Sequence, residues 1–169
     1  NNTGTVTVTQ GDLQLDGTGT DTGAYTVASG ETLTFSNSSG TRDLQSASSV
    51  TGAGTVVFNG SGGTHTVGGT YTITGATTLT NGTNTFSATG VTNLGALTAS
   101  NGTNTIDGTN ITSISDITIN GGTTTLSTGN NYSISTLTVT GGTLDGTSDI
   151  TVTSSATWSA GTIGGTRTL

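Results

Sequence analysis

The chain has 169 residues with a formal net charge of -7, and it contains no cysteine, proline or methionine. Its nine acidic side chains against two arginines argue against binding to nucleic acids or to anionic membranes, because both need a basic surface. The lack of cysteine excludes disulfides and thiolate metal sites, and no apolar run approaches the roughly 20 residues that membrane insertion as a helix requires.

Residues 1–30 predict a less regular N-terminal coil. Val6 and Val8 alternate with threonines, and Leu13 and Leu15 form a second short alternation. Residues that alternate in this way share one face of a strand, so both stretches favour short strands with one buried side.

Three aspartates lie among glycines in the same segment: Asp12, Asp16 and Asp21. Carboxylate oxygens are ligands that calcium prefers. Their spacing fits no ligand loop, however, and solvated turn residues are the simpler interpretation. We therefore predict no metal and no cofactor.

Residues 31–75 predict two longer coils. The step from Gly40 to Gly63 is longer than the glycine steps that follow it, which indicates a small loop. His65, the only histidine, lies in the sequence THTV, where it should point inward. It aligns with Asn84 and Asn104 of the later repeats, so we interpret it as a polar residue in the core or near a corner.

Residues 76–165 consist of regular repeats with a period of about 20 residues, which is typical of a solenoid. Three successive units read ATTLTNGTNTFSATGVTNLG, ALTASNGTNTIDGTNITSIS and DITINGGTTTLSTGNNYSIS. A glycine followed by threonine recurs at a nearly constant spacing: Gly63, Gly82, Gly102, Gly122, Gly142 and Gly161. This glycine therefore marks the same point of each unit.

Each unit holds three short alternating segments separated by Gly, Asn, Ser and Thr corners. One unit cannot bury its apolar side alone, whereas stacking like residues buries that side and pairs the backbone between coils. We therefore predict an all-β chain that forms one parallel β-helix over residues 1–169, with three short strands and about 20 residues per coil. The expected inward residues are Leu97/Ala99, Ile117/Ile119, Leu137/Val139, Phe86, Ile106 and Leu126.

Few residues of the sequence suggest a catalytic function. A glycosidase needs two carboxylates flanking a bond. Asp107 and Asp116 are the nearest pair in the repeats, but they should lie on different strand segments. Trp158 fits either a sugar-stacking platform or a bulky core position, and we favour the core. We therefore predict no enzyme activity.

The units from Gly54 to Gly165, such as TLTNGTNTFSATGVTNLGALTASNG, resemble the repeats of bacterial autotransporter passenger domains and of filamentous-haemagglutinin-type adhesins. This resemblance implies a right-handed β-helix that is secreted and displayed on the bacterial cell surface. It also implies host or surface glycans or proteins as partners. The strand-like sequence at both ends leads us to expect part of a longer rod, or head-to-tail self-association into a filament.

The expected function is therefore a structural or adhesive cell-surface rod: a stalk or passenger segment of a secreted adhesin, or a subunit of an extracellular filament. The alternative is an ice-binding protein, because outward Thr-x-Thr pairs on a flat β-face can order water. A carbohydrate-active enzyme is a less favoured third class. The residues of the expected threonine ladder are Thr64, Thr66, Thr83, Thr85, Thr103, Thr105, Thr123 and Thr125.

Overall fold

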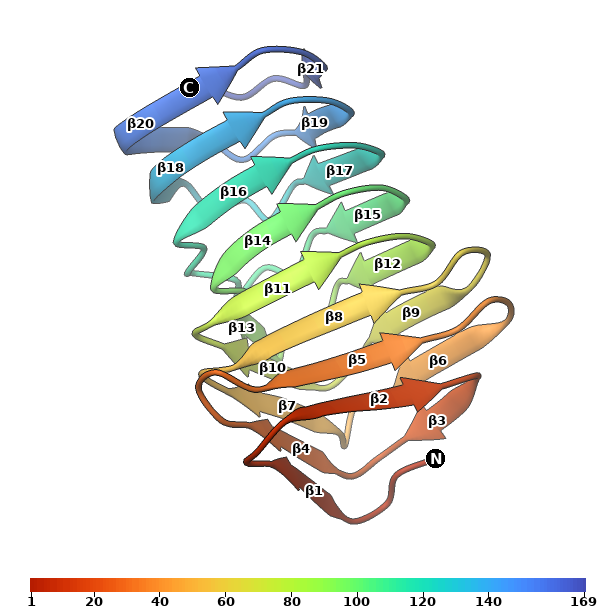
Figure 1. Cartoon of the computed structure of the whole chain (residues 1–169). Helices are drawn as coiled ribbons and strands as arrows, with labels where there is room; N and C mark the ends of the chain where they lie inside the picture. The colour runs from red at the N-terminus through yellow and green to blue at the C-terminus, as the bar shows by residue number, and fades with distance from the viewer.

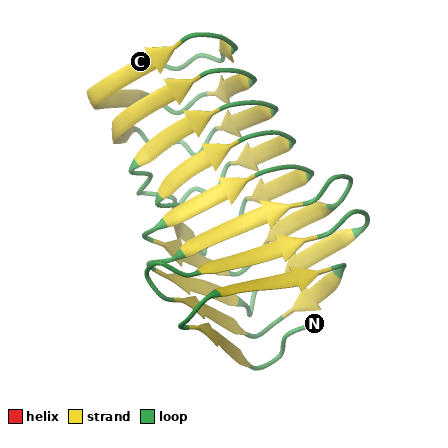
Figure 2. Cartoon of the chain, in the orientation of Figure 1, coloured by secondary structure: helices red, strands yellow, loops and turns green.

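Every regular element of the protein is a β-strand. The computed structural model describes all 169 residues, and Figure 2 shows strands and loops but no helix. The strands stack as successive turns of a right-handed coil, from the N-terminus at one end of the molecule to the C-terminus at the other (Figure 1). In the regular part, Ala76 pairs with Ala96 and Ala96 pairs with Asp116, so the period of the sequence is also the period of strand pairing. The predicted parallel β-helix is confirmed.

Three parallel sheets form the walls of the solenoid, here called sheets A, B and C. Sheet A contains β1 (Thr5–Val8), β4 (Ala24–Val27), β7 (Ser49–Gly52), β10 (Thr70–Ile73) and β13 (Val91–Asn93). Sheet B contains β2 (Asp12–Asp16), β5 (Thr32–Ser36), β8 (Thr55–Asn59), β11 (Ala76–Leu79), β14 (Ala96–Ala99), β16 (Asp116–Ile119), β18 (Tyr132–Val139) and β20 (Ile150–Trp158). Sheet C contains β3 (Gly19–Asp21), β6 (Thr41–Leu44), β9 (Thr64–Val67), β12 (Thr83–Phe86), β15 (Thr103–Ile106), β17 (Thr123–Leu126), β19 (Thr143–Gly146) and β21 (Thr162–Ile163).

The three-strand pattern changes toward the C-terminus. Between β15 and β16 the third segment forms only a single bridge, from Asn93 to Ser113, although Ile111 and Ile114 are buried there. In the next two coils this segment joins the sheet B strand, so β18 and β20 are longer than the other strands. The apolar side chains keep their inward positions even where the backbone ladder is interrupted.

The core follows the alternation of the strands. Thirty buried apolar residues form one continuous cluster along the axis, and all of the expected inward residues belong to it. Each such aliphatic or aromatic side chain contributes about 1.5–3 kcal/mol when it is removed from water. Phe58 contacts the rings of Phe35, Tyr71 and Phe86, with centroid distances of 5.4, 6.1 and 5.3 Å. Aromatic packing is therefore densest in the N-terminal half.

The recurring glycine closes the corner between sheets B and C. Gly82 and Gly102 both have φ of +82°, a conformation that other L-residues adopt at a cost. A Cβ on Gly82 would lie 2.4 Å from the carbonyl oxygen of Gly60, and one on Gly102 would lie 2.3 Å from that of Gly82. The corner stacks on the corner of the preceding coil so closely that no side chain fits, which explains the period seen in the sequence.

The first coil is better ordered than the sequence indicated. Residues 1–30 contribute β1 to β4, and β1 and β2 pair in register with β4 and β5 of the next coil. The two short alternations, of valines and of leucines, are enough to place these strands on sheets A and B.

The last strand of sheet B leaves apolar residues in water. Trp158 pairs with Val139 in the inward register, but no strand lies above β20, and 62% of its surface is exposed. Leu169 is 57% exposed at the same end. The expectation that Trp158 fills the core is therefore wrong in this structure, because burial at an inward position depends on the next coil.

Candidate functional site

The eight threonines of the predicted ladder lie on the outer surface of sheet C in two columns. Thr64, Thr83, Thr103 and Thr123 stack in register across β9, β12, β15 and β17, and Thr66, Thr85, Thr105 and Thr125 stack beside them. The strand pairing extends the first column to Thr41, Thr143 and Thr162, so threonine occupies this position in seven neighbouring strands. The second column ends at Asp43 and Asp145. We call the eight residues the threonine face.

The spacing of this face follows from strand geometry. Residues i and i+2 of a strand are about 6.6 Å apart, and neighbouring strands are about 4.8 Å apart. Thr83, Thr103 and Thr123 are exposed, whereas the second column is half-buried. No side-chain hydrogen bond engages any of the eight hydroxyl groups, in contrast to Thr72 and Thr92, whose hydroxyls pair at 2.7 Å. The threonine face therefore offers a regular array of methyl groups and free hydroxyls to water.

The inner surface of the same strands carries a column of buried polar side chains: Arg42, His65, Asn84, Asn104 and Thr124. His65 Nδ1 lies 2.8 Å from Asn84 Oδ1. The amide of Asn84 donates to Asn104 Oδ1 at 2.8 Å, and the amide of Asn104 donates to Thr124 Oγ1 at 3.2 Å. We call the last four residues the polar ladder. The inward direction of His65 and its alignment with both asparagines agree with the sequence prediction.

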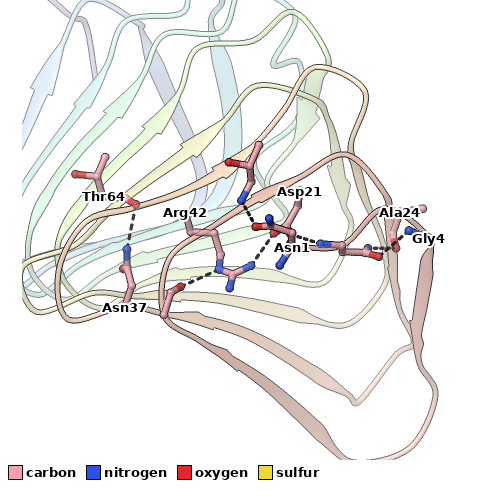
Figure 3. Close-up of polar contacts among 10 residues, drawn as sticks. Asn1, Gly4, Asp21, Ala24, Asn37, Arg42 and Thr64 are labelled. Carbon is pink, nitrogen blue, oxygen red and sulfur yellow. Dashed lines mark hydrogen bonds and ion pairs between the residues drawn. The ribbon is translucent and has the colours of Figure 1, made fainter.

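Arg42 begins this column and pairs with a carboxylate on the preceding coil. Its Nη1 donates to Asp21 Oδ2 at 2.7 Å (Figure 3). Its guanidinium also lies 5.7 Å from the ring centre of Phe35. Asp21 is fully buried and also accepts a hydrogen bond from the backbone N–H of Asn2. Asp21 is therefore not a solvated turn residue, although Asp12 and Asp16 are exposed as expected.

Sequence reasoning missed this ion pair because the two residues are 21 positions apart. The available signal was the Gly-Thr pair at positions 40 and 41, which corresponds to the pair at 63 and 64 and therefore aligns Arg42 with His65 on the inward face. A lone arginine in an inward position of an acidic chain needs a carboxylate partner. Asp43, the neighbour in sequence, points outward and accepts a hydrogen bond from the side-chain amide of Gln45 instead.

The residues considered for catalysis lie apart. Asp107 follows β15 of sheet C and accepts a hydrogen bond from Ser87, while Asp116 opens β16 of sheet B and accepts two from Thr136, at 2.7 and 3.1 Å. The Thr136 hydroxyl, as the largest influence, lowers the pKa of Asp116. These carboxylates tie neighbouring coils together, and no group of three or more His, Asp or Glu side chains lies close enough to hold a metal ion.

The two largest surface hollows contain few side chains that could act in catalysis. The largest, of about 570 Å³, lies at the end of the solenoid between β18 and β20 and is lined mainly by apolar residues, among them Ile150, Val152 and Leu169. A second, of about 470 Å³, lies beside the loop after β5 and is lined by hydroxyl, amide and backbone groups with one carboxylate, Asp16. Neither brings an acid and a base together.

The structure contains no helix that could span a membrane. Comparison with known proteins gives no further assignment, since no protein family, curated protein or solved structure matches the chain.

Proposed function

We propose that the chain is a structural or adhesive rod of the bacterial cell surface, either a stalk or passenger segment of an adhesin or a subunit of an extracellular filament. The observation that supports this best is the uninterrupted core: its 30 buried residues run the length of the solenoid. The outward positions carry mostly threonine, serine, asparagine and glycine. Such a rod gives length, stiffness and a polar coat, which is what a spacer or display surface needs.

The strands at the two ends of the solenoid suit both forms of this proposal, a longer rod or a filament, because each can pair with a further strand. β1, β2 and β3 have unpaired edges at one end, and β20 and β21 have them at the other. Unpaired edges with exposed apolar side chains such as Trp158 favour association with a further strand. Head-to-tail contact between copies is heterologous and can extend without closing. Surface glycans or proteins remain the proposed partners for the sides of the rod.

A rod that works by its length should tolerate the loss of one whole coil. Deleting residues 96–115 joins Gly95 to Asp116, which takes the register position of Ala96 against Ala76. We expect a folded β-protein that is shorter by about 4.8 Å, the spacing of one strand. Circular dichroism reports the fold, and small-angle X-ray scattering reports the length.

The matched control removes half a coil, residues 96–105. After this deletion, residues that belong to sheet C follow directly where a sheet B strand is needed. The strands of neighbouring coils then cannot pair in register, so we expect cooperative unfolding to be lost. If the whole-coil deletion unfolds as completely as the half-coil deletion, the chain is not a modular rod and the proposal fails.

The threonine face favours ice binding as a second candidate function. Its two columns lie in register on one sheet, with spacings of about 4.8 and 6.6 Å, so the threonines form a regular outward array of the kind that can order water. We expect that an ice-binding protein of this design would show thermal hysteresis and would lose most of it in the double variant Thr83→Lys/Thr103→Lys. The control is Thr78→Lys/Thr98→Lys on the outer surface of sheet B.

A wild-type protein without thermal hysteresis would exclude this second function and leave the rod proposal intact. Equal losses in both double variants would show that activity does not come from the threonine face. The carbohydrate-active alternative has no observation in its favour, because the carboxylates of the repeats are engaged singly between coils.

A further inference from the structure

The polar ladder has one direction of hydrogen bonding, and two backbone carbonyls determine it. The amide nitrogen of Asn84 donates to the carbonyl oxygen of Asn81 at 3.2 Å, and that of Asn104 donates to the carbonyl of Asn101 at 3.3 Å. A carbonyl oxygen only accepts hydrogen bonds. The nitrogen of each side-chain amide must therefore face its carbonyl, so neither amide can be turned around.

This orientation determines the tautomer of His65. With its nitrogen committed to Asn81 and Asn104, Asn84 presents its oxygen to His65 Nδ1 at 2.8 Å. An oxygen acceptor requires a protonated nitrogen, so Nδ1 carries the hydrogen of the neutral ring. Nε2 is then a bare acceptor, and it is buried with no hydrogen-bond partner.

The surroundings of His65 disfavour a second proton. The ring is 1% exposed and packs against Phe58 with a centroid distance of 5.4 Å. Among the elements packed around it, β12 presents Asn84, β8 presents Phe58, β5 presents the backbone carbonyl of Phe35, and the loop after β5 presents Asn37; these groups are uncharged. The neighbouring strand β6 presents the Arg42 cation, whose single carboxylate partner, Asp21, is already engaged.

We propose that His65 is an acid-sensitive element built into the solenoid: it supports the polar ladder as the neutral Nδ1–H tautomer, and protonation at Nε2 destabilises the coils around it. Protonation would place a second positive charge in the core beside Arg42, whose carboxylate partner Asp21 is already engaged. The loop carrying Asn37 and the corner at Gly60 cover the ring, since a Cβ on Gly60 would meet Asn37 Oδ1 at 2.5 Å and His65 Cε1 at 3.0 Å.

The direction of the pH effect follows from linkage. Burial is the main cause that lowers the pKa of His65, and Arg42 lowers it further, against the opposing effects of Asn84 and of the Phe35 backbone. Below the unfolded-state value of about 6.5 the unfolded chain therefore binds more protons than the folded chain. The free energy of unfolding falls as the pH drops from about 6.5 toward the lower folded-state pKa. Above about 6.5 the ring is neutral in both states, and this loss of stability is absent.

The test compares urea unfolding of the wild-type protein and of His65→Asn between pH 7.5 and pH 5. Asparagine at this position can still donate to Asn84, and it continues the asparagine column without a titratable group. We expect the unfolding equilibrium constant of the wild type to rise relative to that of His65→Asn by up to about tenfold per pH unit below about 6.5. Carboxylates common to both proteins cancel in this comparison.

A second measurement needs no variant. In ¹⁵N-labelled wild-type protein at pH 7.5, Nδ1 of His65 should resonate as a protonated nitrogen and Nε2 as an unprotonated one. The proposal is overturned if Nε2 carries the proton. It is equally overturned if the wild type and His65→Asn show the same pH dependence, or if acid stabilises the wild type relative to the variant.

Discussion

Replacing Ile117 by aspartate is expected to lower the free energy of unfolding by about 4–5 kcal/mol. Ile117 is fully buried on β16, between Leu97 of one coil and Leu137 of the next. The carboxylate would lose its hydration without gaining a cation, since the nearest structural ion pair lies on coils far along the axis, and the contacts of the isoleucine would also be lost. Urea unfolding followed by circular dichroism measures the loss.

The matched control is Thr98→Asp, which introduces the same charge on the outer surface of the neighbouring strand β14. There the carboxylate stays hydrated, and we expect a change below about 1 kcal/mol. An Ile117→Asp protein as stable as the parent would show that this side chain does not point inward. Equal losses in both variants would mean that the added charge destabilises the sheet on either face, and not through burial.

Replacing Phe58 by alanine is expected to cost about 3–5 kcal/mol. Phe58 is 1% exposed and contacts Phe35, His65, Tyr71 and Phe86, with ring-centre distances between 5.3 and 6.1 Å. The closed solenoid wall limits collapse around the cavity. The variant should therefore lose both the free energy of burying the ring and the packing contacts around the empty space that remains. Thermal or urea unfolding measures the difference.

Two controls separate the cavity from other effects. Val57→Ala changes the adjacent residue, whose side chain lies on the outward face of β8, and should cost less than about 1 kcal/mol. Phe58→Leu keeps much of the volume and should recover most of the loss. A Phe58→Ala protein no less stable than Val57→Ala would contradict the central position of this ring.

Much of the fold could be predicted because it depends on patterns between residues that are close in the sequence. Alternation at i and i+2 assigns the inward side chains of β14, β16 and β18, and the glycine period gives the coil length. The outward position of the threonine face follows from the same alternation. A β-helix pairs like with like, so a repeat in sequence becomes a column in space.

The partners of the buried polar groups could not be predicted in this way. Which carboxylate meets Arg42 depends on how the unequal early coils align, and the structure pairs it with Asp21 rather than with the adjacent Asp43. Each buried polar atom needs a partner in three dimensions, whereas alternation tells only which side of the strand it occupies.

Alternation and the glycine period are sufficient to predict the solenoid, its coil length and the face on which each repeat residue lies. The packing of coil on coil was needed to establish that His65, Asn84, Asn104 and Thr124 form one directed ladder, and that Trp158 lies in water despite its inward register. The alternation of residues along a strand determines on which side of the sheet a side chain lies. The coils above and below determine whether that side chain is buried and what it hydrogen-bonds. Contacts between coils depend on the register in which the strands pair, and this register depends on the length of every loop between them. The alternation of residues within a strand does not reveal how those loops align the coils.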